Sequence, residues 1–418
     1  MLTYPFMGAT TTNVNFGRIW IIGMFALLLI LPRARASARA SSWMLVALAL
    51  LAAVVAVRTA TTPGTKGDYA YGFRVWADSL LLPLILFAVV RRVVAVRAAA
   101  AEWVALTLVV AGLLLAVAGL AEELLGVHLN QVRFDPAIGT VRLAGPYDAP
   151  EPYGLALVLC LAGTLFWLQI RRRARDVHFA VIAIVVLELA AIFFTFFRVA
   201  WLGAFVVVVT SLGLRPKHFS RMLGVLAIAA LVVGLSYTQL EKTSVVSNRV
   251  GNTQNVFARV GAWEQGIEIF KQNPAFGVGV NQYTVVASSL PYLNVSGTNS
   301  VPYPHSSFVL MLAEDGAVGL GALLLACGAV VALLRSLRRR TRSAADGALL
   351  GTLVGAAVAY LAFSLTLAML PFGPSNQFFA VLLGLGAGTL DRLSAPRRRR
   401  AGALVPRVGG GLPAGVAA

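Results

Sequence analysis

The uncharged run VALTLVVAGLLLAVAGL, residues 104–120, decides the fold class of this chain. With its flanks it approaches the roughly 20 apolar residues that a helix needs to cross about 30 Å of hydrocarbon. Similar runs recur at 43–57, 153–170 and 181–197, and the mean hydropathy of the whole chain is +0.80. A soluble domain cannot hide so much apolar surface from water, so the sequence predicts a polytopic all-α membrane protein.

Basic residues cluster in every second connection between the apolar runs. The chain has 35 Lys and Arg against 17 Asp and Glu, a net charge of +18. Most of the basic residues lie near 33–39, 91–97, 171–175, 215–221, 335–342 and 392–407. Cytoplasmic loops of membrane proteins carry such an excess, so we predict that these connections are cytoplasmic. This placement excludes nucleic acid as the partner that the charge would suggest in a soluble protein.

These markers predict a transmembrane helical bundle of about 11–12 spans. The predicted spans are 17–32, 42–57, 76–90, 103–120, 153–170, 178–196, 198–214, 222–237, 305–334, 347–370 and 374–391. No short apolar segment precedes a small-residue cleavage site, so we expect the first span to stay in the protein. The tail 396–418 is rich in Arg, Gly and Pro, and we expect it to be disordered and cytoplasmic.

Three connections are predicted to face away from the cytoplasm, namely 58–75, 121–152 and 238–304. The last is the longest, and long loops usually carry function. Within it, apolar residues recur at spacings of four and three, at Val256, Val260, Trp263, Ile267 and Phe270. This spacing predicts an amphipathic helix on or near the membrane surface, which ends before Pro274.

His305 and Arg198 are the first candidates for a site on that face. His305 follows Pro302-Tyr303-Pro304 at the start of a long apolar span, where an imidazole could move a proton; the alternative is a histidine that caps a helix. Arg198 lies between two apolar runs with almost no loop around it. An arginine there must be paired or face a polar cavity, unless it snorkels to the lipid headgroups.

The long loop and its neighbours add Arg249, Arg259 and Glu314. Arg259 lies one turn from Trp263 on the same helix face. The sequence has no Asp-x-Asp, His-Glu-x-x-His, P-loop or Gly-x-Ser-x-Gly motif, so we predict no metal and no cofactor. Arginines and one histidine suit a substrate with a phosphate-linked leaving group, because guanidinium groups stabilise phosphate charge.

Five short segments together resemble the bacterial O-antigen ligase and polymerase superfamily of membrane glycosyltransferases. In chain order they are RVAWLG at 198–203, RVGAW at 259–263, NPAFGVG at 273–279, HSSFV at 305–309 and EDGAVGL at 314–320. Ser306 stands where the family usually has Asn, and Phe197 where it often has Ser. The joint order of these segments is more specific than any one of them.

This resemblance implies a glycosyltransferase domain over residues 1–395, with its catalytic loop at 238–304. It implies that Arg198, Arg259 and His305 are catalytic and that the donor is an undecaprenyl-diphosphate-linked glycan. We expect Arg249, Trp263, Tyr283 and Glu314 to contact the diphosphate or glycan.

The expected reaction is metal-independent transfer to a hydroxyl of a lipid or glycan acceptor, such as lipopolysaccharide. We expect it to take place on the outer face of the bacterial inner membrane, among membrane lipids. A polysaccharide polymerase of the same superfamily is an open alternative. A transporter or flippase of lipid-linked glycans is another, although such proteins usually show broken helices in related halves.

Overall fold

The computed structural model describes residues 16–31, 37–64, 66–126, 134–135, 140–171, 175–213, 254–290 and 303–395. Helices make up nearly all of this part of the chain. The only strands within it are β1 (Phe134–Asp135) and β2 (Thr140–Val141), which form one short antiparallel pair. The prediction of an all-α fold is therefore confirmed.

The helices follow the predicted spans closely. They are α1 (Phe16–Ile30), α2 (Arg39–Thr61), α3 (Lys66–Trp76), the π-helix η2 (Ala77–Leu81), α4 (Leu82–Val96), α5 (Ala100–Leu125), α6 (Pro150–Ile170), α7 (Arg175–Phe194), α8 (Arg198–Gly213), α11 (Gln254–Gln272), α12 (Tyr283–Ser289), α13 (Ser307–Arg340), α14 (Ala344–Thr366) and α15 (Gly373–Ser394). Every predicted span has a helical counterpart except 222–237, which lies outside the described residues.

Six helical segments of the described chain are long and apolar enough to cross a membrane. These segments are Arg39–Thr61, Tyr69–Val96, Ala100–Leu125, Pro150–Ile170, Ser307–Arg340 and Ala344–Thr366. Two shorter apolar helices, Phe179–Phe194 and Arg198–Leu212, lie beside them. The chain is therefore a multi-pass membrane protein.

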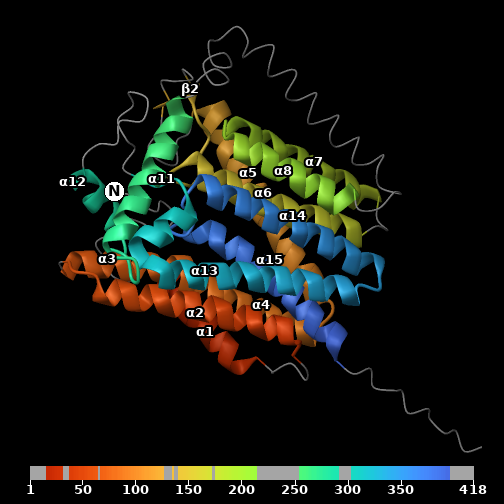
Figure 1. Ribbon diagram of the computed structural model, residues 1–418. Helices are drawn as coiled ribbons and strands as arrows, with labels where there is room; N and C mark the ends of the chain where they lie inside the picture. Colours follow the sequence, from red (N-terminus) through yellow and green to blue (C-terminus); the bar gives the residue numbers. More distant parts are fainter. Residues whose placement is uncertain are drawn as a thin grey trace, which may run out of the picture.

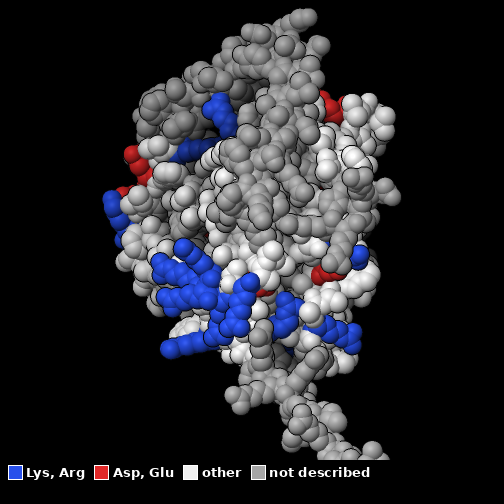
Figure 2. Space-filling view, turned by 90° about the vertical axis from the view of Figure 1, so that its right-hand side faces the viewer, with Lys and Arg blue, Asp and Glu red and all other residues white. Residues whose placement is uncertain are grey.

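The long helices run side by side and give the bundle two different ends (Figure 1). At one end, here called the basic end, α4, α13 and α15 terminate and α2 begins. Figure 2 shows this end, where Lys and Arg gather and few acidic residues are visible. Its arginines include Arg91, Arg92, Arg338, Arg339, Arg340 and Arg392. At the opposite end, here called the site end, α11 lies across the ends of the membrane helices.

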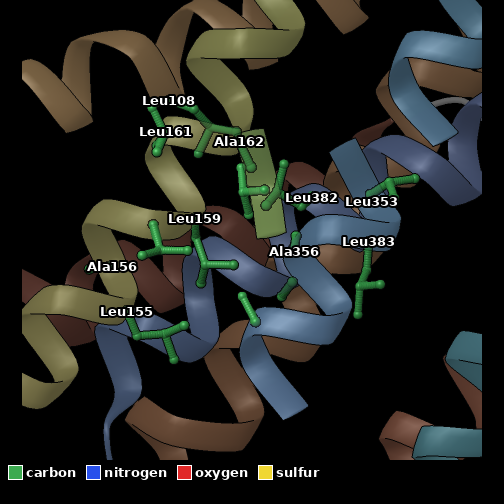
Figure 3. Packing of buried hydrophobic residues seen from close by; sticks show 14 of the residues in the cluster. Leu108, Leu155, Ala156, Leu159, Leu161, Ala162, Leu353, Ala356, Leu382 and Leu383 are labelled. Carbon is green, nitrogen blue, oxygen red and sulfur yellow. The ribbon is translucent and has the colours of Figure 1, made fainter. Parts of the chain in front are cut away.

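Helix α6 is the centre of the core. Its side chains pack against α5, α14 and α15, as the leucines and alanines in Figure 3 show. Glycine permits the closest approach: a Cβ at Gly163 would lie 2.5 Å from the Cβ of Leu108 on α5. Small residues commonly let membrane helices approach in this way, since lipid supplies no hydrophobic force between them.

A buried ion pair ties three helices together at the basic end. The Nε of Arg91 on α4 lies 2.7 Å from Oδ2 of Asp391 on α15, and Asp391 is only 1% exposed. Oδ1 of the same carboxylate accepts a hydrogen bond of 2.7 Å from the backbone N–H of Ala38, just before α2. Arg91 also donates to the Ser37 hydroxyl. This charged pair is therefore well satisfied and holds α2, α4 and α15 together.

Candidate active site

The corner between α7 and α8 carries Arg198. Helix α7 ends at Phe194, and Phe196 adopts a left-handed backbone (φ 49°) before α8 begins at Arg198. Thr195 stabilises this corner, because its hydroxyl accepts a hydrogen bond of 3.3 Å from the Phe197 N–H. The Arg198 side chain is exposed at the site end, at the first residue of its helix.

The segment between β2 and α6 lies against this corner and carries Arg142. Nε of Arg142 donates to the carbonyl oxygen of Thr195 (3.1 Å), and the Leu143 N–H donates to that of Phe194 (3.2 Å). The buried Glu122 of α5 accepts a hydrogen bond of 2.8 Å from the Gly145 N–H. These contacts fix Arg142 beside the α7–α8 corner.

Glu151 completes this part of the site from the first turn of α6. Its carboxylate lies 2.8 Å from a terminal nitrogen of Arg142, and both side chains are largely shielded from solvent. This ion pair thus joins the β2–α6 connection to the first turn of α6.

Helix α11 brings Arg259 to the same place. Small residues let it pack closely on α13: a Cβ at Gly266 would lie 2.3 Å from Cγ1 of Val309. Two residues of the predicted apolar stripe, Trp263 and Ile267, are 37% and 45% exposed, whereas Val260 and Phe270 are half-buried. The uncovered part of the stripe fits the predicted contact with the membrane surface.

His305 lies at the entrance to α13 in a constrained turn. Its backbone is left-handed (φ 44°), and the Ser306 hydroxyl caps α13 by accepting from the Val309 N–H. The ring of Tyr303 meets the imidazole edge to face, with 5.7 Å between centroids. The buried Nδ1 of His305 has no hydrogen-bond partner among the described residues. An imidazole held this way is available for chemistry.

Charges of these residues act on one another. Burial lowers the pKa of Arg259; Glu151 opposes this, while Arg142 and Arg198 lower that pKa further. Burial also lowers the pKa of His305, as does the charge of Arg259, and Glu151 raises it. His305 is therefore neutral near pH 7, and it lies within the electrostatic reach of an arginine cluster. We call Arg142, Arg198, Arg259, Glu151 and His305 the site cluster.

A glycine-rich loop supports the site from behind. Helix α13 is broken at Gly316 (φ 66°, ψ −159°), and the segment 273–279 fills the break. The N–H groups of Val278 and Gly279 donate to the carbonyls of Ala313 and Glu314 (3.0 and 2.8 Å). In return, the N–H groups of Ala317 and Val318 donate to the carbonyls of Pro274 and Ala275 (2.9 and 3.2 Å). The loop thus replaces the helical hydrogen bonds that the break removes.

Glycine is required at this contact. A Cβ at Gly277 would lie 2.4 Å from the backbone of Glu314, and one at Gly316 would lie 2.6 Å from the backbone of Ala275. Both glycines also have positive φ. The NPAFGVG and EDGAVGL segments therefore pack backbone against backbone.

The other predicted site residues lie around this frame. Glu314 is buried and accepts a hydrogen bond of 3.0 Å from the Tyr283 N–H, and the Tyr283 hydroxyl donates to the Ala262 carbonyl (2.6 Å). These contacts connect α12, α11 and α13 internally, and a role in substrate binding stays a prediction for both residues. Trp263 lies one turn from Arg259, and Arg249 lies outside the described residues.

The sequence patterns did not indicate Arg142, Glu151 or Glu122 as site residues. All three lie in or beside the connection 121–152, which was predicted to face outside, and Arg142 stands between the apolar residues Val141 and Leu143. A charged residue between apolar neighbours in an outside loop was the available signal. Within the described part of the chain, no three His, Cys, Asp or Glu side chains gather closely enough to hold a metal ion.

Comparison with known families bears directly on this cluster. Residues 183–324 match the family model described as O-antigen ligase (Wzy_C). This part of the chain is therefore similar to the O-antigen ligase family. The matched segment contains Arg198, Arg259, His305 and the break at Gly316, whereas Arg142 and Glu151 precede it.

One solved structure resembles the chain over most of its length. It belongs to a study of how a peptidoglycan synthase complex coordinates polymerization and crosslinking; the match has 20% identity and a TM-score of 0.42, and it covers 83% of this chain and 96% of the other. No curated protein matches the sequence.

Proposed function

We propose that this protein transfers a glycan from an undecaprenyl-diphosphate carrier to an acceptor hydroxyl on the outer face of the bacterial inner membrane. The observation that carries the proposal is the site cluster, in which three arginines and one glutamate act together beside a neutral histidine. The excess positive charge suits a diphosphate, and the similarity to the O-antigen ligase family agrees with that substrate class.

The arginines have the electrostatic role in this mechanism. Arg198 and Arg259 hold the diphosphate and stabilise the negative charge that develops as the bond to the anomeric carbon breaks. Arg142 adds a third guanidinium, held by Glu151 at 2.8 Å. We also assign Arg249 to the diphosphate, and Trp263 to the glycan or the lipid surface.

His305 serves as the proton acceptor. Its neutral imidazole takes the proton of the acceptor hydroxyl, the hydroxyl oxygen attacks the anomeric carbon, and undecaprenyl diphosphate leaves from the opposite face. This single displacement inverts the anomeric configuration. The arginines supply the positive charge, so the reaction needs no metal.

The fold offers a place for the polyprenyl chain. A cavity of about 290 Å³ lies between α2, α4, α13, α14 and α15, and apolar side chains form most of its wall. Ser307 and Phe308, two and three residues after His305, line this cavity, and Leu334 lines it about seven turns further along α13. A lipid tail in this cavity would keep its diphosphate near His305.

The orientation of the bundle agrees with an outside site. Positively charged connections usually stay in the cytoplasm, so the Lys and Arg that gather at the basic end in Figure 2 support a site cluster on the outside.

Reconstitution tests the proposal directly. The purified full chain in liposomes, given an undecaprenyl-diphosphate-linked glycan and a lipid acceptor, should transfer the glycan in excess EDTA. His305→Ala should lower kcat by about 10²- to 10⁴-fold while donor binding persists. The matched control is His178→Ala, near the start of α7 at the basic end, which should keep full activity.

Two outcomes would contradict the mechanism. Transfer that EDTA abolishes and a divalent ion restores would make His305 a metal ligand. An activity loss in His305→Ala that only matches a loss of folded protein would make it a structural residue.

A further inference from the structure

A second cavity adjoins the site cluster and differs in character from the apolar one. It has a volume of about 400 Å³ and lies between α3, α5, the β2–α6 connection and the start of α15. Aromatic rings form much of its wall: Tyr71, Tyr147, Tyr303, Phe372 and Phe378. Flat rings of this kind pack on the C–H face of a sugar ring.

Polar groups between the rings can bind hydroxyl groups. Asp78, Asp148, Asn281 and Gln377 line the same cavity. Carboxylates accept hydrogen bonds from sugar hydroxyls, and side-chain amides both donate and accept. An apolar pocket with a few convergent polar groups is the usual form of a small-molecule site.

The charged groups that line this cavity differ from those of the site cluster. Its described lining contains two carboxylates, Asp78 and Asp148, and no Lys or Arg, while Arg74 lies outside the lining on the Tyr71 ring, 5.4 Å from its centroid. A phosphate would meet repulsion there, whereas a neutral sugar or an amino sugar would not. The diphosphate is therefore expected at the arginines, and the cavity is better suited to a neutral sugar or an amino sugar.

Two chain segments that line this cavity continue into the site cluster. Tyr303 lines the cavity and contacts the imidazole, with 5.7 Å between ring centroids. On the other side, Pro146, Tyr147 and Asp148 belong to the connection that joins Arg142 to Glu151. A sugar in the cavity would thus lie beside the Tyr303 ring that contacts His305 and beside the connection that carries Arg142.

The cavity also reaches the lipid-facing surface of α5. Leu114, which lines it, is 64% exposed, and Val110 and Val117, which are on the same helix face, are 47% and 49% exposed. Apolar residues that the bundle leaves uncovered along a membrane helix face lipid. A ligand could therefore keep a lipid anchor in the bilayer while its sugar occupies the cavity.

We infer that this cavity binds the acceptor, a lipid-anchored glycan whose reacting sugar is neutral or carries an amine. The acceptor role rests on the proposed glycosyl transfer, whereas the sugar selectivity rests on the cavity alone. Asp148 and Gln377 bind hydroxyl groups or an amine, Phe378 packs on the ring, and His305 takes the proton of the hydroxyl nearest Tyr303.

The selectivity can be measured without turnover. Full-length His305→Ala in nanodiscs is titrated with maltotetraose, deacetylated chitotetraose and a phosphorylated maltotetraose, and binding is followed by saturation-transfer NMR. The neutral and amine-bearing probes should bind about tenfold more tightly than the phosphorylated one, because Asp148 repels phosphate. Asp148→Asn should reduce this preference, and Phe378→Leu should weaken the binding of every probe about tenfold.

Adjacent residues provide a matched control. Phe379 stacks on Tyr360, with 4.2 Å between ring centroids, and lines the other cavity, so Phe379→Leu should leave saccharide binding unchanged. Equal or tighter binding of the phosphorylated probe, or binding that neither Asp148→Asn nor Phe378→Leu alters, would overturn the inference.

The transfer assay separates this inference from the proposed function. With His305 intact, Asp148→Asn should raise the KM for the acceptor about tenfold and leave the donor KM unchanged. If only the donor KM rises, the cavity holds the donor glycan and the inference is wrong, although glycosyl transfer stands. If no transfer occurs at all, the proposed function fails and the acceptor role fails with it, whereas the binding titration still decides the sugar selectivity.

Discussion

The two ends of the bundle use arginine in opposite ways. At the basic end, Arg91 lies 2.7 Å from the buried carboxylate of Asp391, which also accepts a hydrogen bond from the Ala38 N–H. At the site end, the charges that act on Arg259 come from Glu151, Arg142 and Arg198. The buried Arg91 is thus balanced by a carboxylate, whereas the site cluster contains three arginines and one glutamate.

This difference in surrounding charge distinguishes a structural arginine from a functional one more clearly than residue type does. A buried arginine with a satisfied carboxylate holds helices together, and its removal leaves an unpaired charge. An excess of guanidinium groups around a neutral histidine stabilises an anion that arrives from outside. Changes at the basic end should therefore lower stability, and changes at the site end should lower activity.

The largest expected effect is at the basic end. Asp391→Ala leaves Arg91 buried without its carboxylate, so the free energy of unfolding should fall by about 3–5 kcal/mol. A denaturation titration of the protein in mixed micelles measures this loss. Glycan transfer per folded molecule should stay close to that of the wild type, because Asp391 is at the far end of the bundle from the site cluster.

An exposed ion pair is the control for this change. Lys271 and Glu268 lie 2.9 Å apart on α11, with side chains 64% and 49% exposed. Surface pairs of this kind contribute about 0–1 kcal/mol, so Glu268→Ala should change stability little. If Asp391→Ala lowers transfer per folded molecule as strongly as a change in the site cluster does, the division between the two ends is wrong.

Arg259→Lys should cause a large loss of activity. Lysine keeps the charge but lacks the planar fork that binds two phosphate oxygens together. We expect kcat to fall by about 10²- to 10³-fold, nearly as far as in Arg259→Ala, with normal protein levels. Arg171→Lys, in an exposed pair with Glu102, should have no effect. Full activity in Arg259→Lys would leave Arg259 only a diffuse electrostatic role.

A smaller effect is expected at Arg142, which only the structure revealed. Arg142→Gln removes one positive charge from the cluster and frees Glu151 from its ion pair. The donor KM should rise about tenfold, which is the usual worth of one hydrogen bond to a charged group. Arg142→Lys should restore part of this loss. An unchanged donor KM together with lower thermal stability would make Arg142 a structural residue.

The fold could be predicted from the sequence because each span must be apolar over its own length. Basic connections then fixed the order of the two ends, and the helices follow the predicted limits within a few residues. The predicted span 305–334, by contrast, is a helix interrupted at Gly316. Glycine is frequent in membrane helices, so this residue alone did not indicate a break. The break depends on the distant loop at 273–279.

The site could be predicted only where residues form local patterns. Arg198, Arg259 and His305 each belong to a recognisable segment, whereas Arg142 and Glu151 become a pair only when the chain turns at Gly145 and α6 begins. Helix α11 was likewise predicted only in part. Its apolar stripe correctly indicated a helix, but the face that packs on α13 is a different one, which includes Gly266 and the buried Ile269. A glycine contact of this kind does not appear in a hydrophobic pattern.

The smallest expected effect is a change in the pH dependence of transfer. Burial and the charge of Arg259 lower the pKa of His305 below its ordinary value of 6.5, and Glu151 opposes them. If neutral His305 accepts the proton, kcat/KM should persist as the pH falls to 6.5 and decline only below the lowered pKa. Glu151→Gln removes the charge that raises this pKa, so the acid limb of the residual activity should move to lower pH.

The direction of this movement is what the test decides. Glu268→Gln removes a carboxylate of the same kind from exposed α11, outside the site cluster, and it should leave the acid limb in place. A limb that moves to higher pH in Glu151→Gln would contradict the electrostatic coupling, because loss of a negative charge cannot favour the imidazolium form. A limb that stays in place in Glu151→Gln, yet disappears in His305→Ala, would show that Glu151 does not act on the His305 imidazole.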